Sequence, residues 1–185
     1  CYEFSNGSKY TGTVVNGLRD GKGIFSSPQD NIYYDGEWRS GLKHGKGKIK
    51  QYNMELEGEW KEGVLNGKCR IKWKTGNIFE GQLINNAMSG NGYMIWYNKL
   101  EKYCGQWENN LQNGLGIHIW YDTKQDTKYF RDRYIGQWKD GKREGYGKFF
   151  YSNGSIYEGY WKNNKKQGFG IFYYNDRTKY IGNFK

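Results

Sequence analysis

One short pattern recurs along almost the whole of this 185-residue chain and limits what the chain can fold into. The unit reads aromatic-x-Gly-x-aromatic, followed by a short polar turn and then Gly-x-Gly. A clean copy, "YEGYWKNNKKQGFG", starts at Tyr157. Recurrence at a nearly constant period is typical of proteins built from stacked structural repeats. The units start near residues 10, 34, 56, 79, 103, 134, 157 and 180.

The spacing of the units also locates an insertion. Successive starts lie 24, 22, 23, 24, 31, 23 and 23 residues apart. The one long step is explained by the segment "DTKQDTKYFRDR" at residues 122–133. We therefore predict a single repeat array over residues 1–185, interrupted once.

Each unit is predicted to form a β-hairpin. Tyr157, Gly159 and Trp161 alternate with other residues, and side chains on a strand have a period of two, so these three share one face. The Asn-Gly and Asn-Asn pairs between the strands suit the positive φ of tight turns. Glycine has no side chain, so a neighbouring ring can lie across it and be buried there. The same face of the return strand is expected to carry Gly168, Gly170, Phe172 and Tyr174.

Composition supports a folded intracellular protein. The net charge of +10 is typical of disordered chains, but 19% of the residues are aromatic, which disordered chains lack. Cys1, Cys69 and Cys104 are too few and too scattered for a disulfide framework, which favours a reducing compartment. No apolar run approaches the ~18 residues that a membrane helix needs.

The motif Tyr-x-Gly-x-Trp-x-x-Gly-x-x-x-Gly-x-Gly at this period resembles the MORN repeat (membrane occupation and recognition nexus). The resemblance covers essentially the whole chain. It implies an all-β fold: an elongated, single-layer antiparallel meander of about seven to eight β-hairpin repeats. The departures are local and predict small packing irregularities; they are Val14, Leu56, Cys69 and Leu83.

The ring-bearing face of such a sheet has two interpretations. Aromatic residues at a fixed repeat position usually build the fold. The alternative is an aromatic groove that accepts a peptide or helix from a partner. Both interpretations apply to the five matched tryptophans, Trp38, Trp60, Trp107, Trp138 and Trp161.

The opposite face is predicted to change character along the chain. In the second and third repeats its return strands are basic and its outgoing strands acidic, so cross-strand pairs should neutralise it. The basic residues are Lys46, Lys48, Lys50, Lys68, Arg70, Lys72 and Lys74, and the acidic ones Asp35, Glu37, Glu57, Glu59 and Glu80.

From the fourth repeat onward the same face is apolar. Large exposed apolar patches usually mark an interface, so a docked partner protein is one interpretation, and cover by the insertion is the other. The residues concerned are Tyr93, Ile95, Tyr97, Leu115, Ile117, Ile119, Tyr121, Phe169, Ile171 and Tyr173.

The last two complete repeats have basic turns. Such turns can dock on anionic phospholipid head groups, at about 1 kcal/mol per charge near the surface, although lysine is also common in exposed turns. The candidates are Lys139, Lys142, Arg143, Lys162, Lys165 and Lys166.

The residues of enzymes and metal sites do not come together in the sequence. His44 falls in a turn, and His118 falls at an inward position, where we expect it to be packed. No ligand spacing suggests a metal, no nucleophile has an adjacent base, and no glycine-rich run leads from a strand into a helix. We expect no catalysis, no cofactor and no nucleic-acid partner.

The resemblance implies an intracellular scaffold that holds a partner protein in a cytoskeletal, ciliary or membrane-apposed assembly. The alternatives are a membrane-tethering module that uses the basic turns, and a regulatory segment of a larger enzyme such as a phosphoinositide kinase. Self-association through the apolar face or the open edge strands remains a further alternative.

Overall fold

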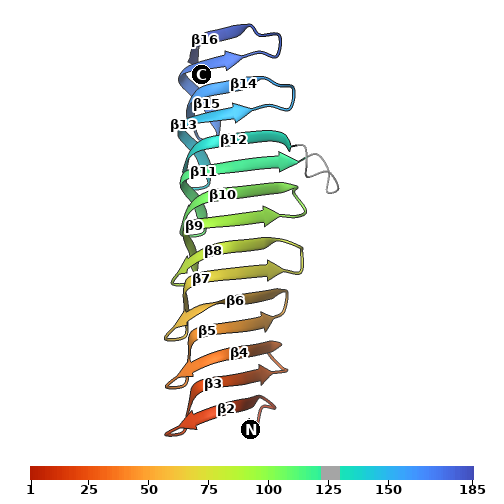
Figure 1. The fold of residues 1–185 in the computed structure, drawn as a ribbon, viewed down its shortest axis with the longest axis vertical. Coiled ribbons are helices and arrows are strands. Elements are labelled where there is room, and N and C mark those ends of the chain that lie inside the picture. Colours follow the sequence, from red (N-terminus) through yellow and green to blue (C-terminus); the bar gives the residue numbers. More distant parts are fainter. Residues whose placement is uncertain (122–129) are drawn as a thin grey trace. The chain divides into compact units, whose positions relative to one another are not determined.

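The structure is a computed structural model that describes residues 1–121 and 130–185, apart from the side chain of Phe130. The described residues form sixteen antiparallel strands in one open sheet, whose order follows the sequence, and no helix (Figure 1). The all-β, single-layer meander is thus confirmed. The strands are β1 (Tyr2–Glu3), β2 (Lys9–Val15), β3 (Leu18–Ser27), β4 (Ile32–Arg39), β5 (Leu42–Gln51), β6 (Met54–Lys61), β7 (Val64–Trp73), β8 (Ile78–Ile84), β9 (Ala87–Trp96), β10 (Glu101–Glu108), β11 (Leu111–Tyr121), β12 (Phe130–Lys139), β13 (Lys142–Phe150), β14 (Ile156–Lys162), β15 (Lys165–Tyr173) and β16 (Lys179–Phe184).

The chain divides into two compact units, unit 1 (Cys1–Ala87) and unit 2 (Met88–Lys185). Unit 1 contains β1–β8, and unit 2 contains β10–β16 with nearly all of β9. The insertion expected at 122–133 lies mostly outside the described residues, and so does the question whether it covers the apolar face. Its last residues belong to β12.

Seven hairpin turns have the geometry that their sequences predict. Each joins two strands through two residues, and both residues have positive φ, as in type I′ turns. Asparagine and glycine adopt this conformation at little cost, which explains their frequency here. The turns are Asn16–Gly17, Ser40–Gly41, Glu62–Gly63, Asn85–Asn86, Asn109–Asn110, Asp140–Gly141 and Asn163–Asn164.

Paired glycines cross the strands of each repeat and seat the tyrosine rings. Gly116 pairs with Gly105 on one side and with Gly136 on the other. A Cβ added at Gly116 would lie 2.2 Å from Oη of Tyr103 and 2.5 Å from its ring carbons. Tyr103 is fully buried in this position, and its hydroxyl donates a hydrogen bond to the Gln106 carbonyl. Glycine is required because any side chain would occupy the space of the ring.

The third repeat departs from this rule in two places at once. Leu56 replaces the tyrosine, and Cys69 replaces the glycine opposite Gly58. Both side chains are buried, as is the neighbouring Leu65. A leucine at position 56 lacks the ring that would collide with the Cys69 side chain, so the two departures compensate each other. Burial raises the pKa of the Cys69 thiol to about 11.

The tryptophans of the motif pack between tyrosines. Trp138 meets Tyr103 and Tyr134 edge to face, with ring centroids 5.5 and 5.2 Å apart. Trp161 makes the same contacts with Tyr134 and Tyr157, and its indole N–H donates to the Gly147 carbonyl. Such edge-to-face pairs contribute about 0.5–1.5 kcal/mol beyond the buried area.

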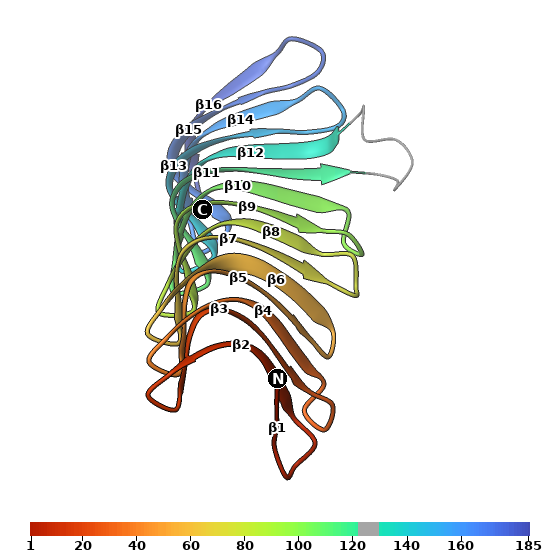
Figure 2. The same cartoon turned by 60° about the horizontal axis from the view of Figure 1, so that its bottom comes forward.

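We call the face that carries these tyrosines, glycines and tryptophans the inner face, and the opposite one the outer face. Figure 2 shows that the strands are bent. In most hairpins the pairing register shifts directly after the glycine of the outgoing strand, as between Gly136 and Trp138. Such a bulge bends a strand, and side chains inside a bend converge, which is how a single layer of sheet buries its rings.

Candidate interaction surfaces

The five tryptophans predicted to line a groove are core residues. Their exposed fractions are only 5–7%, so no partner can reach them without unfolding the sheet. This corrects the groove interpretation for these residues and supports the structural one. The residues are Trp38, Trp60, Trp107, Trp138 and Trp161.

A different set of rings is accessible on the inner face of unit 2. These rings occupy the second and fourth positions after the second glycine of the Gly-x-Gly in the return strand. The sequence motif does not include these positions. Successive ring centroids lie 5.6, 4.2, 5.6, 4.5, 5.6 and 4.7 Å apart. We call this set the aromatic file; its members are Trp96, His118, Trp120, Phe149, Tyr151, Phe172 and Tyr174.

The file is buried on one side and open on the other. His118 and Phe149 are buried, Trp96, Trp120, Tyr151 and Phe172 are half-buried, and Tyr174 is 46% exposed. The corresponding residues of unit 1 are mostly not aromatic: Phe25, Ser27, Ile49, Gln51, Ile71 and Trp73. An accessible, continuous aromatic surface is therefore a property of unit 2.

His118 is packed within the file, as its sequence position predicted. Its ring stacks on Trp120 at 4.2 Å with an interplanar angle of 10°, and its Nε2 lies 3.2 Å from a carboxylate oxygen of Glu101. Burial, with a smaller effect of Arg143 and Lys99, lowers the pKa of His118 to about 4. The imidazole is therefore neutral near pH 7 and donates its Nε2 proton to Glu101.

Two cationic side chains make cation–π contacts with rings of the inner face. The Arg143 guanidinium stands 4.5 Å from the Trp161 ring centroid, and the Lys166 ammonium stands 4.5 Å from that of Phe172. Burial lowers the pKa of both groups. Such cation–π contacts stabilise the fold by about 0.5–2 kcal/mol each.

The structure thus separates the six predicted lipid-binding residues. Arg143 and Lys166 belong to the inner face, whereas the other four are exposed beside the turns. Lys139 stands opposite Lys142, and Lys162 stands opposite Lys165. Their binding to phospholipid stays a prediction.

The outer face of unit 1 is a row of alternating charges. Asp35, Lys48, Glu57, Arg70 and Glu80 stand opposite one another in turn across β4–β8. The last two form an ion pair of 2.9 Å. The basic strands are neutralised by their neighbours, as predicted from the sequence.

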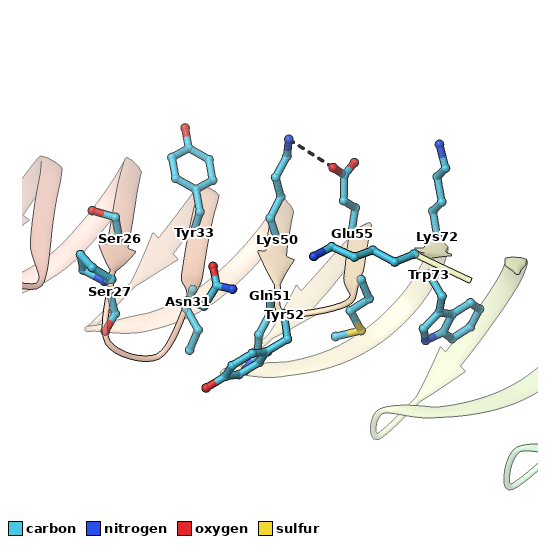
Figure 3. A pocket seen from close by; sticks show the side chains of 14 residues that line it. Ser26, Ser27, Asn31, Tyr33, Lys50, Gln51, Tyr52, Glu55, Lys72 and Trp73 are labelled. Atoms are coloured by element: carbon cyan, nitrogen blue, oxygen red, sulfur yellow. Dashed lines mark ion pairs between the residues drawn. The ribbon is translucent and has the colours of Figure 1, made fainter. Parts of the chain in front are cut away.

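A hollow of about 570 Å³ lies in unit 1 where β3–β7 meet their loops (Figure 3). Tyr33, Lys50, Glu55 and Lys72 project to one side of the sheet and Trp73 to the other. Lys50 and Glu55 form an ion pair of 3.2 Å across it. The lining has no adjacent nucleophile and base, so we assign it no chemistry.

The outer face of unit 2 is apolar, as predicted. Leu115 is 62% exposed, and Ile117, Phe169 and Tyr173 are also exposed, while Ile95, Ile119 and Ile171 are half-buried. Ile135, Tyr146, Tyr160 and Ile181 enlarge the patch. Docking of a partner protein on this face stays a prediction.

Groups of metal ligands and membrane-spanning helices were sought in the described part of the chain. Within residues 1–121 and 130–185 no three His, Cys, Asp or Glu side chains are grouped as metal ligands. The same residues include no helix of the length and apolarity needed to cross a bilayer.

Comparison with known proteins identifies the repeats. The family model described as MORN repeat matches residues 10–32, 34–53, 57–78, 79–100, 103–123, 134–156 and 157–179. The chain is 29% identical over 126 residues to alsin of Rattus norvegicus and, equally, of Homo sapiens, over 68% of this chain and 5% of alsin. It is 33% identical over 77 residues to MORN repeat-containing protein 3 of Xenopus laevis, over 42% of this chain and 32% of that protein. The chain thus spans only a small part of these relatives.

A solved structure has the same fold. It is titled the SAS-4 (dCPAP) TCP domain in complex with a proline-rich motif of Ana2 (dSTIL) of Drosophila melanogaster. The alignment covers 100% of this chain and 95% of that one, with a TM-score of 0.53 and 11% sequence identity. At this identity the similarity concerns the fold alone.

Proposed function

Because this chain belongs to the MORN repeat family, we propose that it is a non-catalytic scaffold that holds a partner protein, and that the aromatic file of unit 2 is where it holds it. The observation that carries the proposal is the accessibility of these rings. Every motif tryptophan is buried, yet four rings of the file are half-buried and one is exposed. The core is already formed by the buried rings, so the half-buried and exposed rings of the file are not needed to build it.

The geometry of the file favours an extended segment of the partner. Its rings form a line that crosses the return strands β9, β11, β13 and β15 and the residues that follow them. An extended chain can contact successive rings along such a line. A polyproline II segment has little conformational entropy to lose and packs its flat rings on aromatic side chains. A proline-containing apolar segment is therefore the ligand class that fits best.

The structural neighbour gives independent support for this ligand class. In that structure a proline-rich motif is in complex with a domain of the same fold. For the present chain this similarity is a reason to test proline-containing peptides first. The cellular setting, whether cytoskeletal, ciliary or membrane-apposed, belongs to the same proposal.

The proposal is tested by fluorescence anisotropy with a panel of labelled, proline-containing synthetic peptides. We expect one or more peptides to bind the wild-type chain and Trp120→Ala to weaken that binding at least about tenfold, as is usual for a central aromatic contact. Circular dichroism must show that the variant remains folded.

Trp73→Ala is the matched control. Trp73 has the same repeat position as Trp120 and is also half-buried, but it lies in unit 1, where no aromatic file is present. This variant should bind as the wild type does. Failure of every peptide to bind, or equal losses in the two variants, would exclude the file as the site.

A further inference from the structure

One row of the outer face of unit 2 has an unusual internal symmetry. Its residues stand directly opposite one another in turn across β11–β16. The centre is an ion pair of 2.9 Å between Lys148 on β13 and Glu158 on β14. Two isoleucines follow on each side, so that the row reads Ile117, Ile135, Lys148, Glu158, Ile171 and Ile181.

The flanking positions nearest the midline are also matched. Tyr146 on β13 stands opposite Tyr160 on β14, and their rings meet edge to face at 5.5 Å. On the other side of the central row, Phe150 stands opposite Ile156. Apolar side chains therefore lie on both sides of the central charges next to the midline between β13 and β14. Farther from the midline the two halves differ, since Arg133 corresponds to Tyr173 and Gln137 to Phe169.

We propose that this face binds a second copy of the chain, with a two-fold axis that runs parallel to the strands over the midline between β13 and β14. A two-fold axis makes each half of a surface meet the other half of its copy. Lys148 would then lie against Glu158 of the second copy, and Ile135 against its Ile171. Each of these contacts occurs twice, and none of them brings like charges together. Arg133 would lie against Tyr173 of the second copy, whose ring can accept a cation–π contact from the guanidinium.

A contact of limited extent is expected to give a weak dimer. The strands are bent. The rings buried on the inner face place that face inside the bend, so a contact through the outer face is limited to the central row and its immediate flanks. An interface of roughly 1,000–1,200 Å² in total is at the low end for specific complexes. Association in the micromolar range follows from an interface of this kind.

A second copy fits this face better than a lipid surface does. An anchored Lys148–Glu158 pair at the centre of the contact must be desolvated, and lipid tails offer no polar group in return. A second copy offers the reciprocal pair. The equivalent Lys48 and Glu57 of unit 1 lie in a row of alternating charges with no isoleucine pairs around them, so unit 1 cannot form this contact.

Sedimentation velocity of the 185-residue chain over about 1–300 µM tests the proposal across the range of weak interfaces. Wild type should form reversible dimers. Lys148→Glu places Glu against Glu158 of the copy, and Glu158→Lys places Lys against Lys148, so each variant alone should associate at least about tenfold more weakly. An equimolar mixture of the two variants restores opposite charges at both contacts and should dimerise again.

Lys48→Glu is the matched control, because Lys48 has the same repeat position as Lys148 and also stands opposite acidic residues. It should associate as wild type does. A wild type that stays monomeric, a dimer that both charge variants retain, or a mixture that stays monomeric would overturn the proposal. The outcome is independent of the peptide experiment, because the aromatic file lies on the opposite face.

Discussion

At the scale of single residues, the fold depends on glycines that seat rings and on one position where the pair has been exchanged. Leu56 and Cys69 show that a side chain is tolerated in a glycine position when the facing tyrosine is absent. The two positions should therefore be energetically coupled wherever the standard pair occurs.

We predict that Gly116→Cys destabilises the chain by about 3 kcal/mol or more, because the added side chain collides with the Tyr103 ring. In a Tyr103→Leu background the same substitution should cost less than about 1 kcal/mol. Urea unfolding of the four proteins in this double-mutant cycle measures the coupling. Additive losses would show that the ring does not determine the need for glycine.

His118 makes a second prediction at this scale. Burial lowers the pKa of His118 to about 4. Between about pH 6.5 and 4 the imidazole is therefore protonated in the unfolded chain but remains neutral in the folded chain. Stability should therefore fall as the pH drops from about 6.5 to 4, by on the order of 3 kcal/mol in total. Burial raises the pKa of Glu101, which acts in the opposite direction.

His118→Phe is the matched variant, because Phe149 and Phe172 have this repeat position in the next two repeats. If His118→Phe has the lower unfolding free energy at pH 7, this deficit relative to the wild type should shrink, or change sign, as the pH falls from 7 to 4. The reason is that acid destabilises only the protein with the imidazole. Parallel pH profiles of the two proteins would contradict the assignment of a neutral, buried imidazole.

At the scale of the hairpin, neighbouring turns are tied together by a backbone bond. The second turn residue donates its N–H to the carbonyl of a residue in the preceding hairpin, as Asn164 does to Arg143. Where the second turn residue is asparagine, its side-chain oxygen also accepts a hydrogen bond from the backbone N–H of the same residue in the preceding hairpin. The Arg143 N–H donates to Asn164 Oδ1 at 2.8 Å. Asparagine therefore adds a reciprocal bond that glycine cannot make.

We predict that Asn164→Gly lowers the unfolding free energy by about 1 kcal/mol through loss of this bond. Asn163→Gly is the control, because Asn163 also has positive φ and its side chain contacts only the exposed Lys142 ammonium at 3.3 Å. Thermal unfolding should place Asn163→Gly closer to wild type. Equal losses would mean that the effect arises from glycine in the unfolded chain instead.

The hairpins, their turns and the two faces could be predicted from sequence, because a period of two and a period of about 23 residues determine them. The burial of Trp38 and its counterparts agrees with the structural interpretation of their fixed repeat position. The bend of the strands that buries them could not be predicted, since no linear pattern records it. Trp96, Trp120 and Tyr151 were missed because they lie outside the motif, and Tyr174 was expected on the ring-bearing face but not as part of an accessible surface. Their signal was present, however, in the recurrence of an aromatic residue four positions after the glycine of the return strand.

At the scale of the whole molecule, the two units share a fold but differ in what they expose. Unit 1 presents alternating charges on its outer face and few accessible rings on its inner face. Unit 2 presents the aromatic file on one face and a symmetric apolar row on the other. We propose that recognition of a partner belongs to unit 2, with unit 1 contributing the same framework without a binding surface.

The eight tryptophans of the chain allow this claim to be measured directly. The 185-residue chain is titrated with a proline-containing peptide that binds it, and the titration is followed by ¹H–¹⁵N NMR. Each indole N–H signal reports on the surroundings of its own tryptophan. We expect the indole signals of Trp96 and Trp120 to change in chemical shift on peptide binding, while those of Trp38, Trp60 and Trp73 in unit 1 stay unchanged. Movement of the unit 1 signals, with those of Trp96 and Trp120 unchanged, would contradict it.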